Sequence, residues 1–90
     1  MKYEFQKEFF VVYDLDTKNG KLFHLWTNLI HFLTDEVMKG SCRIIYDGDC
    51  WRMPKSYAEC FDTLWNVESL DDLNEILEDL YRVQLVHFED

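Results

Sequence analysis

Hydrophobic and polar positions along this 90-residue chain predict eight short elements, beginning with a β-hairpin. The segment from Glu8 to Asp16 is rich in Phe, Val and Tyr and reads as a strand. The next four residues, 17–20, form a turn in which Gly20 suits a positive φ. A second strand then returns from Lys21 to Leu25. The chain therefore opens with two antiparallel strands.

A helix and a second, shorter hairpin follow. Apolar residues recur at the helical period between Thr27, which suits the N-cap, and about Lys39, with Gly40 at the C′ position. Residues 42–46 then form a strand. Asp47-Gly48 is typical of a type I′ turn, so residues 50–53 are expected to form a short return strand.

The second half predicts two helices and a closing strand. Ser56 and Glu59 fit a capping box for a helix that extends to Trp65. Ser69 starts another helix in the same way, which we expect to continue to about Arg82 with one buried apolar stripe. Residues 83–88 close the chain as a strand. This order predicts a single domain over residues 1–90, of α/β or α+β class, in which about three helices pack on a single small sheet that contains the N-terminal antiparallel hairpin.

Charge is distributed very unevenly along the chain. With 48% hydrophobic and 17% aromatic residues, the composition is that of a folded domain rather than a disordered one. Residues 1–45 hold six basic and six acidic residues, whereas residues 46–90 hold three basic and twelve acidic ones. The second half therefore carries the whole formal net charge of −9. Such self-repulsion destabilises a compact state, and a cationic partner would explain why it is retained.

The acidic residues are most concentrated between Lys55 and Arg82, where the sequence has no base. The carboxylates of this segment are Glu59, Asp62, Glu68, Asp71, Asp72, Glu75, Glu78 and Asp79. Asp71, Glu75 and Asp79 are spaced four residues apart, so we expect them in one row along the last helix, at steps of about 6 Å. An ordinary solvated helix face is an equally good interpretation of the pattern alone.

The overall acidity restricts the class of partner and the location. A pI near 4.6 argues against direct binding to nucleic acid or to an anionic membrane, and it favours a basic protein surface. The longest apolar run, from Phe9 to Tyr13, is too short for a membrane span or a signal peptide. Three cysteines at spacings that match no metal site are expected as reduced thiols. We therefore expect a cytoplasmic protein.

The remaining chemistry of the sequence predicts neither a catalytic nor a metal site. His24, His31 and His87 lack further ligands at metal-site spacing, and no phosphate loop or nucleophile–histidine pair is present. We therefore expect no cofactor and no enzymatic activity. Trp51, next to the second turn, is the best candidate for an exposed aromatic anchor. The segment from Lys2 to Phe10 reads as an edge strand that would allow a homodimer.

From about Ile44 onward the chain resembles the barstar-like ribonuclease inhibitors. The similarity lies in a strand that ends at Gly48, a helix over residues 56–65, the segment Ser69-Leu70-Asp71-Asp72-Leu73-Asn74-Glu75-Ile76-Leu77, and a strand over residues 84–88. In that family the second helix plugs the active site of a basic ribonuclease. The resemblance implies that Asp71 and Glu75 stand where the inhibitory acids stand, and Asn74 replaces a family Trp. In size and acidity the chain is also similar to phage-encoded DNA mimics that block restriction enzymes.

These observations together predict a small acidic inhibitor. It would bind the basic nucleic-acid site of a nuclease, restriction factor or DNA-binding protein and exclude the true substrate. The predicted partner-binding residues are Asp71, Asp72, Glu75, Glu78, Asp79, Glu59, Asp62, Glu68 and Trp51. The alternative is a non-catalytic regulatory or structural interaction module, with a homodimer as one form, whose acidity serves only solubility.

Overall fold

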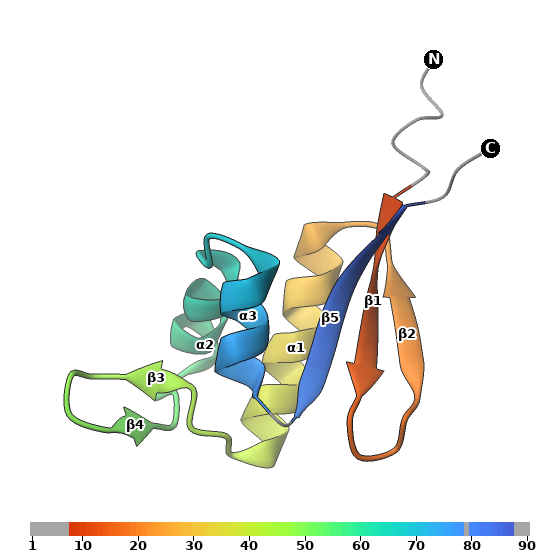
Figure 1. Cartoon of the computed structure of the whole chain (residues 1–90). Helices are drawn as coiled ribbons and strands as arrows, with labels where there is room; N and C mark the ends of the chain where they lie inside the picture. Colours follow the sequence, from red (N-terminus) through yellow and green to blue (C-terminus); the bar gives the residue numbers. More distant parts are fainter. Residues whose placement is uncertain (1–7, 79, 88–90) are drawn as a thin grey trace.

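A computed structural model describes residues 8–78 and 80–87 of the chain (Figure 1). The observed class is α+β, with three helices and two antiparallel sheets, which confirms the predicted class and element order. The elements are β1 (Glu8–Asp14), β2 (Gly20–Phe23), α1 (Trp26–Gly40), β3 (Ile45–Tyr46), β4 (Trp51–Arg52), α2 (Tyr57–Trp65), α3 (Leu70–Leu77) and β5 (Tyr81–His87).

The main sheet has three strands in the order β2-β1-β5, all antiparallel. The predicted edge strand from Lys2 to Phe10 is wrong for residues 8–10, which belong to the central strand β1, and residues 2–7 lie outside the described residues. In its register Val12 of the central strand lies between Lys21 of β2 and Val83 of β5. Because side chains alternate along a strand, these three residues share one face of the sheet. The strands β3 and β4 pair only with each other and form a separate ribbon, so the second hairpin does not extend the predicted sheet.

The helices cover one face of the main sheet (Figure 1). Helix α3 lies along β5, and α2 packs mainly on α1. Val12 and Val83 of the sheet meet apolar side chains from all three helices. The buried cluster comprises Val12, Leu29, Ile30, Leu33, Val37, Ile44, Cys60, Leu64, Leu73, Leu77 and Val83. Burial of these side chains from water is the main force that holds the helices on the sheet.

Helix α1 occupies almost the expected residues but has different caps. It begins at Trp26, after Leu25, so Thr27 is not its N-cap and no side chain caps its first turn. At the other end Ser41, rather than Gly40, adopts the left-handed conformation, with φ of 55°. Its backbone N–H donates to the carbonyl of Val37, which satisfies one carbonyl of the last turn.

Both turns are displaced from the positions that the glycines predicted. In the first hairpin Lys18, not Gly20, has a positive φ, of 69°, and Asp14 Oδ1 accepts the N–H groups of Asp16 and Thr17. In the second, Tyr46 pairs with Trp51, so the central turn residues are Gly48 and Asp49 rather than Asp47 and Gly48. All three cysteines are free thiols, as expected.

Helix α3 ends five residues before the position that the sequence predicted. Its last residue is Leu77, after which Glu78 adopts a φ of 47°, and the N–H of Leu80 donates to the carbonyl of Leu77 at 2.9 Å. Pairing with β1 begins at Tyr81, so this segment forms strand instead of helix. The predicted helix as far as Arg82 is therefore wrong, and Leu80, which would have belonged to the buried stripe of that longer helix, is 37% exposed.

Candidate partner-binding surface

Helix α3 is held in place by its cap and by its apolar side. Ser69 has an extended backbone, and its Oγ accepts the N–H of Asp72 at 3.1 Å, as the sequence predicted. Leu73 and Leu77 are completely buried on the inner side of the helix. Asp71 lies in the first turn with Asp72, where the partial positive charge of the helix N-terminus stabilises carboxylates.

Asn74 fastens this helix to the edge of the main sheet, a role that the sequence analysis missed. Its side-chain Oδ1 accepts the N–H of Val83 at 2.7 Å, and its Nδ2 donates to the carbonyl of the same residue at 2.9 Å. The amide thus occupies the outward-facing hydrogen-bonding groups of β5, which an additional strand would otherwise use. An asparagine next to the apolar stripe of a short helix was the available sequence signal for such a contact.

The acids of α3 are directed away from the sheet. At about 100° per residue, Asp71, Asp72 and Glu75 fall within an arc of about 100°. Glu75 lies almost opposite the middle of the buried side defined by Leu73 and Leu77, and all three carboxylates are exposed. The structure therefore brings these predicted residues together on one outer surface.

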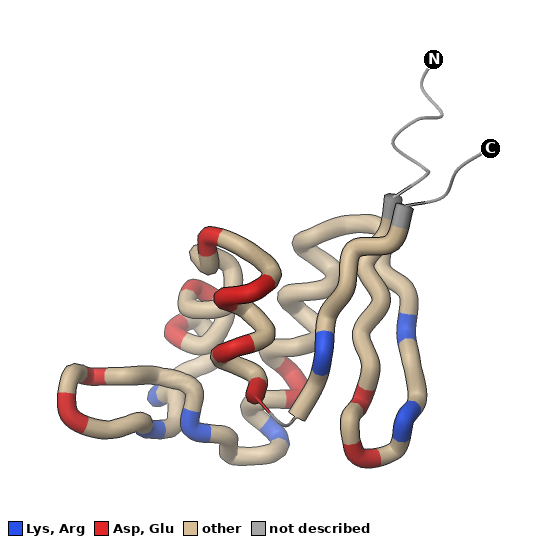
Figure 2. Tube along the Cα trace, viewed as in Figure 1, with Lys and Arg blue, Asp and Glu red and all other residues tan. Residues whose placement is uncertain are grey.

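Three further predicted acids are exposed as well, on α2 and at the two ends of α3. Asp62 on α2, Glu68 between α2 and α3, and Glu78 at the end of α3 are also exposed. We call the six carboxylates the acidic face: Asp62, Glu68, Asp71, Asp72, Glu75 and Glu78. None of the six makes a salt bridge within the part of the chain that the structure describes. Figure 2 shows acidic positions on α2 and α3 with no basic position among them. Asp79, which was predicted to belong to this set, lies outside the described residues.

Glu59 does not belong with these free carboxylates. Arg52 binds it in a bidentate manner, at 3.0 and 2.6 Å, and the backbone N–H of Lys55 donates to it at 2.7 Å. Arg52 is the main cause that lowers the pKa of Glu59 to about 2. Ser56 caps α2 as predicted, by accepting the N–H of Glu59 at 3.1 Å. The carboxylate of Glu59 does not complete the capping box but pairs with Arg52 at the base of the β3–β4 ribbon.

Trp51 lies on this ribbon, and it is exposed as the sequence suggested. Its ring is 5.2 Å from that of Tyr46, and the two side chains are 48% and 56% exposed. Asp47 orders the turn, because its Oδ1 accepts the N–H groups of Cys50 and Asp49, and these bonds lower the pKa of Asp47. The ribbon projects beside the helical layer (Figure 1). It therefore presents an ordered aromatic pair rather than a loose loop.

The structure gives no support for a metal centre within the described residues. No group of three or more His, Cys, Asp or Glu side chains there is arranged to hold a metal ion. His31 instead makes a 2.8 Å hydrogen bond with the hydroxyl of Tyr57, and His24 packs against the ring of Phe9. Both side chains therefore have structural contacts of an ordinary kind.

Over residues 8–78 and 80–87, no helix combines the length and hydropathy that a membrane crossing requires. The resemblance to barstar-like inhibitors and the likeness to DNA mimics stay predictions. The chain was compared with protein-family models, with curated proteins and with solved structures, and none of the three comparisons gave a match.

Proposed function

We propose that the protein is a small acidic inhibitor that binds a cationic nucleic-acid site on another protein. The partner would be a nuclease, a restriction factor or a DNA-binding protein. The observation that carries the proposal is the acidic face, with six exposed carboxylates and no internal salt bridge among the described residues. Carboxylates that are already free of intramolecular partners can pair with lysine and arginine without first breaking another contact.

The spacing of the acids supports mimicry of a nucleic-acid strand. Asp71 and Glu75 are one helical step of four residues apart, which is a rise of about 6 Å. This distance is of the same order as the spacing of phosphates along a strand. Because Asn74 and two buried leucines fix α3 to the sheet, the partner would meet a preorganised array and little ordering entropy would be lost on binding.

The aromatic pair of the β3–β4 ribbon supplies a short-range contact in this proposal. Trp51 and Tyr46 are exposed, and Asp47 and Asp49 lie at the turn between their strands. Aromatic side chains are frequent anchors at interfaces, and acids beside them suit an apolar pocket rimmed by basic residues. The acids would thus set the rate and salt dependence of association, whereas Trp51 would slow dissociation.

Capture from a lysate with matched charge variants tests this proposal. Immobilised wild type is compared with Asp71→Lys/Glu75→Lys and with Asp16→Lys/Asp35→Lys, which changes the net charge equally but lies outside the acidic face. We expect basic nucleic-acid-binding proteins to be retained by wild type and by the control pair. They should be lost from the α3 variant, displaced by duplex DNA, and released when salt is raised from about 50 to 500 mM, which screens exposed charges.

The proposal would be abandoned if both charge variants retained the same proteins as wild type. A purified captured enzyme then allows a direct measurement of inhibition. Binding that does not change with salt or with the α3 variant would show that the acids act only in solubility.

One observation favours the second candidate function, an interaction module that uses an apolar surface. Tyr46, Trp51 and Met53 are each about half exposed on or next to one ribbon, and an apolar cluster of this kind is typical of a contact site. Sedimentation of wild type and Trp51→Ser tests self-association through this ribbon. A wild-type dimer that dissociates in the variant supports this function, and a wild-type monomer rejects its homodimeric form.

A further inference from the structure

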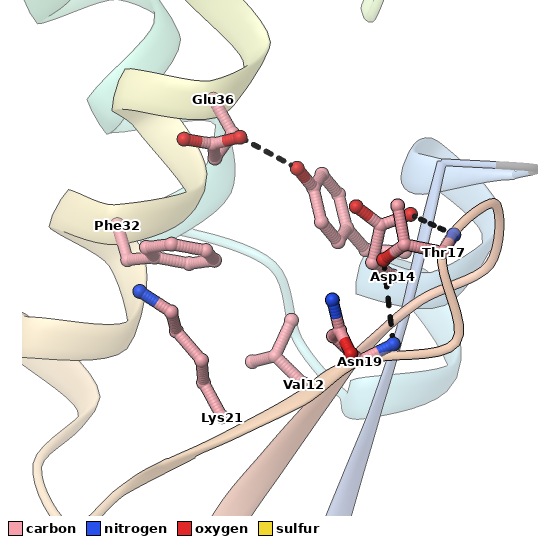
Figure 3. A pocket seen from close by; sticks show the side chains of 8 residues that line it. Val12, Asp14, Thr17, Asn19, Lys21, Phe32 and Glu36 are labelled. Atoms are coloured by element: carbon pink, nitrogen blue, oxygen red, sulfur yellow. Dashed lines mark hydrogen bonds between the residues drawn. The ribbon is translucent and has the colours of Figure 1, made fainter.

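A cavity of about 260 Å³ lies between the β1–β2 hairpin and α1 (Figure 3), and none of its lining residues belongs to the acidic face. The hairpin provides Asp14, Thr17, Asn19 and Lys21 to its wall, and α1 provides Glu36. The remaining lining residues are Val12, Phe32 and Tyr81. Pockets for drug-sized molecules usually measure about 300–1,000 Å³, so this one suits a smaller ligand.

The cavity places one cation opposite two anions. Lys21 Nζ lies 4.9 Å from the centre of the Phe32 ring, in a cation–π contact. No salt bridge among the described residues involves Lys21, although Asp14 and Glu36 line the same cavity. Figure 3 shows the Lys21 amine beside the ring, with Glu36 farther along α1 and Asp14 across the opening. The three charged lining residues therefore do not pair with one another, although Lys39, outside the lining, lies 3.5 Å from Glu36 Oε2.

The two carboxylates are ordered and keep free accepting capacity. Asp14 Oδ1 accepts two backbone N–H groups, at 2.8 Å from Asp16 and 3.2 Å from Thr17, while none of the hydrogen bonds between described residues uses Oδ2. Glu36 Oε1 accepts the hydroxyl of Tyr81 at 2.7 Å, and its Oε2 faces the largely exposed Lys39 ammonium at 3.5 Å. Burial and the bond to Glu36 raise the pKa of Tyr81, so its hydroxyl stays a donor to this carboxylate. Ionised carboxylates can accept several hydrogen bonds at once.

We propose that this cavity binds a free basic amino acid, such as arginine. Its α-carboxylate would pair with Lys21, and its ammonium and side-chain cation would meet Asp14 and Glu36. The apolar stem would lie on Phe32 and Val12. The three charged lining residues sum to −1, which a basic amino acid with net charge +1 neutralises, and its side-chain cation would compete with the exposed Lys39 ammonium for Glu36. A purely anionic ligand would meet two carboxylates, and a purely cationic one would leave Lys21 unpaired.

Titration of the ¹⁵N-labelled full chain with L-arginine, followed by NMR, tests the proposal. We expect saturable shifts at the amides of Thr17 and Asn19. Agmatine, which lacks the α-carboxylate, and N-acetyl-L-argininamide, which mimics an arginine within a protein, should bind about tenfold or more weakly, because a charge-assisted hydrogen bond is lost. L-Citrulline, which lacks the side-chain charge, should bind more weakly than arginine to a similar extent.

Two variants assign the contacts. Lys21→Met should abolish the difference between arginine and agmatine, whereas Lys18→Met, on the same hairpin but outside the lining, should preserve it. Lys21 also packs on Phe32, so its replacement could disturb the fold, and Glu36→Gln provides a second test. The glutamine oxygen can still accept the Tyr81 hydroxyl, so this variant should bind arginine more weakly without unfolding.

Three results would overturn the proposal. The first is that the shifts do not saturate with arginine. The second is that agmatine or the blocked argininamide binds wild type as tightly as arginine does. The third is that the difference in affinity between arginine and agmatine survives in Lys21→Met. None of these results bears on the acidic face, because the cavity shares no lining residue with it.

Discussion

Replacement of Asn74 by alanine should strongly destabilise the protein, although a helical alanine is favourable in itself. The side-chain amide of Asn74 makes two hydrogen bonds, at 2.7 and 2.9 Å, with the N–H and the carbonyl of Val83. Val83 is only 1% exposed, so its backbone groups do not readily exchange these bonds for water. The substitution removes both partners at once.

The size of the effect follows from the two backbone groups left without partners. A buried donor or acceptor that loses its hydrogen bond costs about 1–3 kcal/mol, so the two groups together should lower the free energy of unfolding of Asn74→Ala by about 2–6 kcal/mol. A chain of this length is expected to have a total stability of about 5–13 kcal/mol. The variant should therefore lose a large share of its stability and show a clearly lower denaturation midpoint.

Urea denaturation followed by tryptophan fluorescence measures this change. Asn66→Ala is the matched control, because the Asn66 amide donates one bond, to the carbonyl of Asp62 at 2.8 Å, at the exposed end of α2. We expect the control to lose less than about 1 kcal/mol. An Asn74→Ala variant no less stable than the control would refute the assigned role of Asn74.

Three further measurements follow from the charges and thiols. Because the pKa of Glu59 is lowered to about 2 from an ordinary 4.5, its ion pair stabilises the fold above pH 4.5, and this contribution disappears as the pH falls towards 2. Urea denaturation at several pH values should therefore show the free energies of unfolding of Glu59→Gln and wild type converging over that window. Burial raises the pKa of the Cys60 thiol to about 11, so a disulfide reagent should modify exposed Cys50 first, and Cys50→Ser should remove the fast phase. Added salt should raise the melting temperature of the free protein by screening the acidic face, and the increase should be smaller in Asp71→Lys/Glu75→Lys. Equal increases in both proteins would argue against repulsion between the carboxylates of the acidic face.

Local periodicity was sufficient to predict the element order, because each helix has a one-sided apolar pattern. Ser56 and Ser69 cap their helices as expected, since the cap depends on residues only three positions apart. The exposure of Asp71 and Glu75 follows from the same local argument, because Leu73 and Leu77 determine which side of α3 is buried. These features are encoded within single elements.

The features that the sequence could not predict depend on pairing between distant segments. Helix α3 ends at Leu77 because Tyr81 and the residues after it pair with β1, about 70 positions earlier in the chain. Arg52 and Glu59 are only seven residues apart, but they belong to different elements and pair only because the ribbon folds back onto α2. Helical periodicity carries no information about either contact, so Glu59 was grouped with the free acids.

The position of the carboxylates, more than their number, distinguishes a binding surface from charges that only keep a protein soluble. An acid that serves solubility can lie anywhere on the exterior, and separated acids repel one another least. Asp71 and Glu75 instead share one side of α3, where like charges four residues apart oppose the helix by about 0.2–0.5 kcal/mol. Glu78 adds a negative charge at the helix C-terminus, where the partial charge is already negative. Asp71 gains from the helix N-terminus, but its repulsion with Glu75 and the position of Glu78 oppose the helix, and approaching cations would relieve this cost. The proposed cationic partner would give this concentration of charge a function.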